Sequence, residues 1–97
     1  MTRQDILDRL KAEGPSLRLR FGLRAMAVFG SMARGDDQEG SDLDVLVTFE
    51  GKADFDRFMG LKLHLEETFG RSVDLLTPNS LRPEVQAEIE KEAILVP

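Results

Sequence analysis

Asp42 and Asp44 are the residues of this chain whose types and spacing point most directly to chemistry. They open the apolar run 42–49, which has the composition and alternation of a β-strand. Alternate side chains of a strand share a face, so both carboxylates would project from one face. The opposite face would be apolar, formed by Leu43, Val45, Val47 and Phe49. Aspartate is a poor strand former and like charges repel, so the pair indicates a divalent cation rather than a folding role.

A glycine and a serine, Gly30-Ser31, end the preceding apolar run, 24–29, which also predicts a strand. Glycine allows close approach of the backbone, and Ser31 would cap a short helix that runs to Arg34. A polar turn over 35–41 would then return the chain to the strand that carries the two aspartates.

A third carboxylate lies on the next predicted strand, 72–77. Val73 and Leu75 would share one face of this strand, and Asp74 would lie on the other. Asp74 is therefore a candidate to join the first two carboxylates, the alternative being an ordinary solvated strand residue.

Gly30-Ser31, ten intervening residues and Asp42-x-Asp44 resemble the signature of the DNA polymerase β superfamily of nucleotidyltransferases. The longer match, GSMARGD over 30–36 and SDLDVLV over 41–47, resembles the MNT proteins, minimal nucleotidyltransferases often found as antitoxin partners of HEPN-type toxins. The resemblance implies an α+β fold in which a small mixed sheet carries the carboxylates on one face and packs helices on the other.

The resemblance also implies roles for individual residues. Asp42, Asp44 and Asp74 would be the catalytic carboxylates and would bind Mg²⁺, which prefers hard oxygen ligands and substrate phosphates. Two ions roughly 3.5 to 4 Å apart can assist an in-line transfer. Gly30 and Ser31 would hold the triphosphate of ATP through backbone N–H groups and the hydroxyl. Arg34 would neutralise phosphate charge.

Each role has a plainer alternative. Gly30-Ser31 alone could be an ordinary strand-to-helix turn, and short motifs of this kind often match by chance. Arg34 could pair with Asp36 or Asp37 on the surface. Three acidic residues are interpreted as turn solubility and one histidine as an ordinary helix residue: Asp36, Asp37, Glu39 and His64.

The remaining elements follow from apolar spacing and from Gly and Pro. Thr2 would cap a helix over 3–13 that ends at Gly14-Pro15, and the segment 16–21 fits either a strand or, as we favour, a separate helical turn. A helix over 53–69 would pack an apolar stripe on the sheet, formed by Phe55, Phe58, Leu61, Leu65 and Phe69. A last helix would begin near Pro83 with Val85, Ile89 and Ala93 on one face, and 94–96 would form an edge strand or dock on a partner.

Composition limits the class of protein. The 97 residues predict a single domain, 1–97, with little room for an acceptor-binding lobe, so that surface would come from a partner. The net charge is -5, with a balance of +4 over residues 1–34 (7 Lys/Arg against 3 Asp/Glu) and -9 over the remainder. This predominantly acidic balance argues against a protein that coats nucleic acid, which normally has a dominant basic patch. The absence of cysteine excludes disulfides and thiolate sites. No signal or membrane-spanning segment is recognised, which predicts a cytoplasmic protein.

The function that the resemblance implies is transfer of AMP from ATP to a tyrosine hydroxyl of a HEPN-type toxin, which would make this chain an antitoxin. Two alternatives stay open: a catalytically weak nucleotide-binding antitoxin that acts by occlusion, and nucleotidyl transfer to a small molecule. The acceptor, the base preference and the choice between homo- and hetero-oligomer do not follow from the sequence.

Overall fold

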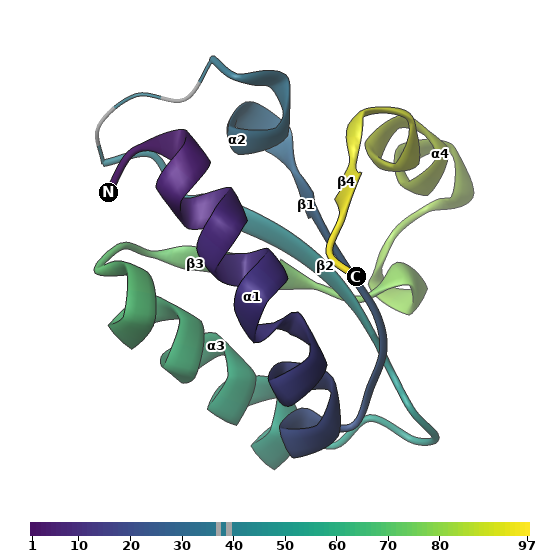
Figure 1. Ribbon diagram of the computed structural model, residues 1–97. Coiled ribbons are helices and arrows are strands. Elements are labelled where there is room, and N and C mark those ends of the chain that lie inside the picture. The colour runs from purple at the N-terminus through teal and green to yellow at the C-terminus, as the bar shows by residue number, and fades with distance from the viewer. Residues whose placement is uncertain (37, 39) are drawn as a thin grey trace.

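The computed structural model describes residues 1–36, 38 and 40–97 (Figure 1). In chain order the elements are α1 (Arg3–Phe21), β1 (Leu23–Phe29), α2 (Gly30–Arg34), β2 (Leu43–Phe49), α3 (Phe55–Phe69), β3 (Val73–Leu76), a 3₁₀ turn (Pro78–Ser80), α4 (Pro83–Glu92) and β4 (Ile94–Leu95). The three longer strands and the helix over 53–69 were predicted to within two residues of these bounds. The predicted turn over 35–41 includes Asp37 and Glu39, which lie outside the described residues.

The four strands form one mixed sheet in the order β3-β2-β1-β4. β1 pairs antiparallel with both β2 and β4, whereas β2 pairs in parallel with β3. The predicted α+β class with a small mixed sheet is therefore confirmed. The C-terminal residues 94–96 were left open between an edge strand and a partner contact, and Ile94–Leu95 pairs with β1 as an edge strand.

The first helix is longer than predicted, because α1 continues through Gly14-Pro15 to Phe21. A proline inside a helix costs about 3 kcal/mol or more through a lost hydrogen bond and a clash with the preceding turn. Leu17 and Phe21, however, are buried on the same stripe as Leu10, and each such burial contributes about 1.5–3 kcal/mol. Burial of the second half of the helix thus outweighs the break, so the prediction of a stop at Gly14-Pro15 was wrong.

Gly14 has a packing role in place of the predicted stop. It is buried, and a Cβ atom at this position would overlap the carbonyl oxygen of Pro97. The C-terminal segment passes through the space that a side chain at position 14 would fill. Nearby, Arg18 Nη2 donates to the carbonyl of Val96 at 2.6 Å. The helix ends instead at Gly22, whose φ of 65° is the left-handed conformation that suits glycine.

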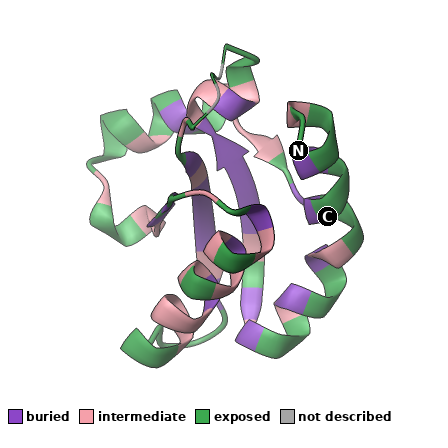
Figure 2. Ribbon diagram, turned by 90° about the vertical axis from the view of Figure 1, so that its left-hand side faces the viewer, coloured by how far each residue is buried: buried purple, intermediate pink, exposed green. Residues whose placement is uncertain are grey.

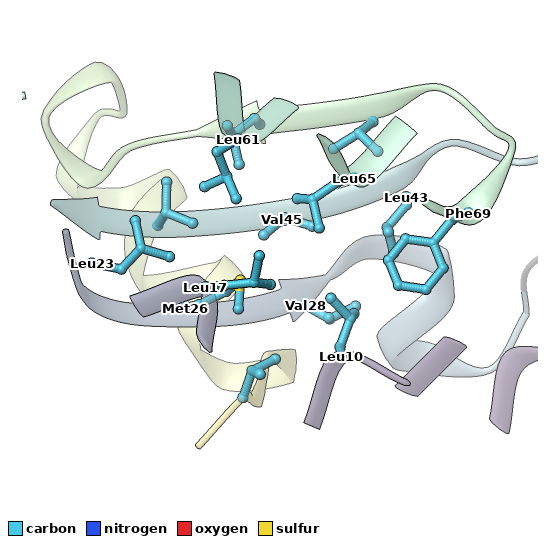
Figure 3. Packing of buried hydrophobic residues seen from close by; sticks show 14 of the residues in the cluster. Leu10, Leu17, Leu23, Met26, Val28, Leu43, Val45, Leu61, Leu65 and Phe69 are labelled. Carbon is cyan, nitrogen blue, oxygen red and sulfur yellow. The ribbon is translucent and has the colours of Figure 1, made fainter. Parts of the chain in front are cut away.

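The main core lies between the sheet and the two long helices α1 and α3, which cover the same face (Figures 1 and 3). It includes the apolar residues that were predicted to face α3, namely Val45, Val47, Phe49, Val73 and Leu75. From α3 it takes Leu61, Leu65 and Phe69, with Phe58 at its border. The two central strands β1 and β2 are largely buried (Figure 2).

Phe55 departs from the predicted stripe, since it is 65% exposed. It is the first residue of α3, and Arg57 covers the Phe49 ring at this end of the core in its place. The Arg57 guanidinium lies 5.1 Å from the centre of the Phe49 ring and donates to the carbonyls of Phe21 and Gly22. The Arg57 guanidinium, stacked on the Phe49 ring with its hydrogen bonds satisfied, therefore covers this border of the core, and Phe55 is not needed there.

The opposite face of the sheet is only partly covered. Here α4 contributes Ile89, which packs with Phe29 and Leu46 in a second, smaller apolar cluster. Of the predicted stripe on this helix, Val85 is exposed. Beside this cluster the sheet carries a hollow lined by Ala25, Ala27, Leu46 and Thr48. No helix in the described part of the chain has the length and apolarity needed to cross a membrane.

Candidate active site

Asp44 and Asp74 are neighbours in the sheet. The parallel register pairs Leu43 with Val73 and Asp44 with Asp74, so the two aspartates lie side by side near the beginning of their strands. Their chain neighbours Leu43 and Val73 face the main core, which places both carboxylates on the face that α1 and α3 leave free. The structure therefore brings together two residues that the sequence separates widely.

Asp42 was predicted to be the first residue of the strand, but β2 begins at Leu43, so Asp42 lies immediately before it and is exposed. Its carboxylate is close enough to Asp44 to affect the titration of that residue. Burial and the negative charges of Asp74 and Asp42 raise the pKa of Asp44, whereas the positive charge of Arg34 acts in the opposite direction. The ionised form of Asp44 is thus disfavoured in the free protein, and a bound cation would relieve this.

Gly30 places the Gly-Ser motif against the carboxylates. Its φ is 70°, and a Cβ atom there would overlap Asp44 Oδ2, so both the backbone and the contact need glycine. The β-ladder explains the contact, because Phe29 pairs with Asp44 where β1 ends and β2 begins. The two halves of the motif are therefore adjacent in space.

Ser31 is the second residue of α2 rather than its cap, because the helix begins at Gly30. The predicted capping role was wrong, since the N-cap is Phe29 and makes no side-chain hydrogen bond to the helix. The Ser31 carbonyl closes the end of the same turn by accepting from the N–H groups of Gly35 and Asp36.

Arg34 is held by two carboxylates. Its Nε donates to Asp36 Oδ2 at 3.1 Å, and its Nη1 lies 3.3 Å from both oxygens of Glu92. These hydrogen bonds, that to Asp36 first, raise the pKa of Arg34. The surface pairing considered for Arg34 is therefore present with Asp36, while Asp37 lies outside the described residues.

Glu92 is a site neighbour that sequence reasoning missed. It is the last residue of α4, and its Oε1 accepts from the backbone N–H of Gly30 at 3.1 Å. Its charge also contributes to the raised pKa of Asp44. Glutamate in a surface helix is commonplace, and only the tertiary fold brings this one to Gly30, so no sequence signal marked it.

His64 does not belong to this group. It lies between α3 and α1, with Nε2 at 3.5 Å from Glu13 Oε1 and its ring 6.0 Å from that of Phe21. This agrees with its interpretation as an ordinary helix residue.

The residues present fit a hard cation in their chemistry, although they do not form a finished cage. Across residues 1–36, 38 and 40–97, no three acidic, histidine or cysteine side chains converge as a ready metal cluster. Mg²⁺ is usually held by one or two carboxylates together with water and substrate phosphates, so a site completed by nucleotide needs no such cluster. The crowding of Asp44 by the like charges of Asp74, Asp42 and Glu92 is the feature that favours a cation.

The family model described as Polymerase beta, Nucleotidyltransferase matches residues 16–97, and the chain belongs to this nucleotidyltransferase family. A relative named protein adenylyltransferase MntA, from Thermococcus cleftensis, is 38% identical over 96 residues, which are 99% of this chain and 97% of that protein. The resemblance inferred from the motifs is thereby confirmed, and the chain is an enzyme of the transferase class.

Solved structures agree on the fold. A structure described as a minimal nucleotidyltransferase superposes with a TM-score of 0.85 at 38% identity, covering 97% of this chain and 95% of the other. A complex of a tri-AMPylated HEPN toxin from Shewanella oneidensis with its MNT antitoxin matches with a TM-score of 0.67 at 16% identity, covering 93% and 71%. At that identity the second match shows the fold alone.

Proposed function

We propose that this chain transfers an adenylyl group from ATP to a tyrosine hydroxyl of a HEPN-type toxin and thereby acts as its antitoxin. The observation that carries the proposal is the arrangement of Asp44 beside Asp74 and against Gly30, within a chain of the nucleotidyltransferase family. The acceptor class is supported by the name of the Thermococcus relative and by the AMPylated toxin in the Shewanella complex.

The carboxylates would hold the metal. Asp42, Asp44 and Asp74 would hold Mg²⁺ together with the nucleotide phosphates. When bound, the ions would neutralise phosphate charge and help the leaving oxygen depart. The N–H of Gly30, the Ser31 hydroxyl and the Arg34 guanidinium would bind the β- and γ-phosphates and leave the α-phosphate near Asp44.

The transfer itself exchanges one phosphorus–oxygen bond for another. The acceptor oxygen forms a bond to the α-phosphorus of ATP, the bond from that phosphorus to the bridging oxygen breaks, and pyrophosphate leaves with the electron pair. The hydroxyl proton passes to the Asp74 carboxylate, which is exposed on the same face as Asp44 and so accessible to an acceptor. The open face beside these residues is where the partner would dock.

Labelled ATP tests this directly. The chain is incubated with Mg²⁺ and the HEPN-type toxin of the same host, using ATP labelled at either the α- or the γ-phosphate. We expect label on the toxin only from α-labelled ATP, and none when the toxin tyrosine is changed to phenylalanine. Label from the γ-phosphate would instead identify a kinase, and no label from either would refute the proposal.

Two further arms address the alternatives. If the chain acted by occlusion, its Asp44→Asn variant would inhibit the toxin as well as the wild type does. A transferase would instead need both Asp44 and ATP for inhibition. Free tyrosine should be a far poorer acceptor than the folded toxin, because specificity would come from docking between the two proteins. Equal rates on both acceptors would contradict the docking argument and favour a small-molecule substrate.

A further inference from the structure

Two of the groups assigned to the nucleotide phosphates already bind an anion of the protein itself. The backbone N–H of Gly30 donates to Glu92 Oε1 at 3.1 Å, and Arg34 Nη1 lies 3.3 Å from each oxygen of the same carboxylate. A carboxylate presents two oxygens to these donors much as a phosphate would. Glu92 thus lies where the triphosphate would have to bind.

The fold fixes the backbone of Glu92 at this place. On its N-terminal side, Ile89 anchors the end of α4 in the small apolar cluster with Phe29 and Leu46. On its C-terminal side, β4 pairs with β1, and the N–H of Val96 donates to the carbonyl of Met26 at 2.9 Å. The helix end is therefore held from both directions, so we expect any displacement of Glu92 to be a movement of its side chain alone.

The neighbouring carboxylates repel the negative charge of Glu92, and the Gly30 N–H and Arg34 oppose this repulsion. Glu92 adds a third negative charge to those of Asp42 and Asp74 around Asp44, and its side chain is 30% exposed, so water is within reach. A glutamate in this place is explained if its contacts with Gly30 and Arg34 compensate the repulsion. Those contacts are the ones that a bound nucleotide would replace.

We propose that Glu92 is an intramolecular competitor of the nucleotide triphosphate, docked on Gly30 and Arg34 in the free protein and displaced when ATP binds. The proposal rests on the proposed function, because it assumes that these donors bind phosphate. It also assigns a selectivity: a ligand with β- and γ-phosphates displaces the glutamate, whereas AMP offers little to replace it. The competitor would therefore discriminate between a triphosphate and a monophosphate.

Calorimetric titration with AMP-PNP and Mg²⁺ tests the competition on three proteins: wild type, Glu92→Gln and Glu88→Gln. Glu88 is the matched control, since it lies one turn earlier on α4 and pairs only with exposed Lys91 among its described contacts. When the binding-competent state is a minor fraction, apparent affinity falls by that fraction, so removing the competitor should tighten binding about three- to tenfold. Glu88→Gln should remain within about twofold of wild type, as expected for a remote surface charge.

The same variants should respond differently to AMP. Glu92→Gln should gain affinity for AMP-PNP and not for AMP, because only the former reaches the donors that Glu92 vacates. An equal gain for both ligands would show a general charge effect and overturn the competition.

The Gly30 amide reports the docking without any nucleotide. In a ¹H–¹⁵N spectrum of the free protein, Glu92→Ala should shift the Gly30 resonance, because its hydrogen bond is lost, while Glu88→Ala should not. An unchanged Gly30 resonance in Glu92→Ala would refute docking, and the remainder of the spectrum shows whether the variant is folded.

The outcomes separate this inference from the proposed function. If wild type binds AMP-PNP, Asp44→Asn does not, and Glu92→Gln is unchanged or weaker, then the nucleotide site stands and the competitor role is wrong. Weaker binding would identify Glu92 as a ligand of the nucleotide or its metal instead. If none of the proteins binds AMP-PNP, both proposals fail together.

Discussion

The two faces of the sheet are built for different purposes. On one face, α1 and α3 enclose a continuous apolar core in which Val45 and Leu65 are almost fully buried. On the other, Asp44 and Asp74 lie together beside a small cluster around Ile89. The same strands supply both faces through the two-residue alternation of a β-strand. Stability is therefore concentrated on one side of β2 and unfavourable charge on the other, and substitutions on the two faces should have separable effects.

The largest effect is expected from Asp44→Asn on adenylyl transfer. An amide cannot supply the anionic ligand, and loss of several kcal/mol of charge stabilisation corresponds to about a thousandfold or more in rate. Initial rates with α-labelled ATP measure this, with exposed Asp8→Asn on α1 as the control. Transfer at the wild-type rate would remove Asp44 from the mechanism and would contradict the assignment of activity to the carboxylate face.

On the apolar face, Leu65→Ala should lower the free energy of unfolding by about 2–5 kcal/mol, because it leaves a cavity beside the sheet. Leu65 is 1% exposed, whereas Leu63 on the same helix is 56% exposed, so Leu63→Ala should change stability by no more than about 0.5 kcal/mol. Urea unfolding measures both variants. The transfer rate per folded Leu65→Ala molecule should remain that of the wild type, and a parallel loss would show that the two faces are not independent.

Ligand should reverse the electrostatic disadvantage of the carboxylate face. Nucleotide and Mg²⁺ together, at a hundredfold excess over Kd, would contribute about 2.7 kcal/mol to the folded state. For a domain of this size each kcal/mol is worth roughly 4–8 °C in Tm. A thermal melt with AMP-PNP, Mg²⁺, both or neither should show the rise only with both, and Asp44→Asn should lose most of it. Equal shifts in the two proteins would place the bound metal elsewhere.

The smallest effect concerns the free protein. Burial and the neighbouring carboxylates raise the pKa of Asp44 in the folded state above its unfolded value, so the ionised group destabilises the fold above that raised pKa. Asp44→Asn should therefore melt at the wild-type temperature or up to about 4 °C higher near neutral pH. The difference should shrink as the pH falls through the raised pKa, because the wild-type carboxyl becomes neutral too. Exposed Glu67→Gln on α3 serves as the control, and a lower Tm for Asp44→Asn would contradict the argument.

Local patterns were sufficient for the strands and for the parity of their side chains. The alternation that begins at Leu43 and Val73 placed Asp44 and Asp74 on the free face. Gly14-Pro15 led to a wrong prediction of a helix end. The free-energy cost of these two residues in a helix is smaller than the gain from burying Leu17 and Phe21, and that gain depends on packing with distant strands. A local signal predicts correctly when tertiary burial agrees with it.

The residues that sequence reasoning missed act through distant partners. Arg57 replaces Phe55 at the border of the core because its side chain reaches Phe49 and the carbonyls that end α1. Glu92 reaches Gly30 because β4 pairs with β1 and carries the end of α4 with it. Neither arrangement has a periodicity or a spacing that could be recognised in the chain.

The parallel pairing of β2 with β3 has a consequence for the order of folding. Parallel neighbours need a crossover, here α3, so the contact between Asp44 and Asp74 closes a long loop, and we expect it to form late in folding. Long-range pairings of this kind form slowly, because closing the intervening loop costs conformational entropy before the new contacts can compensate that cost. A ligand that needs both aspartates would then bind after the folding transition state, and would slow unfolding while leaving the folding rate almost unchanged.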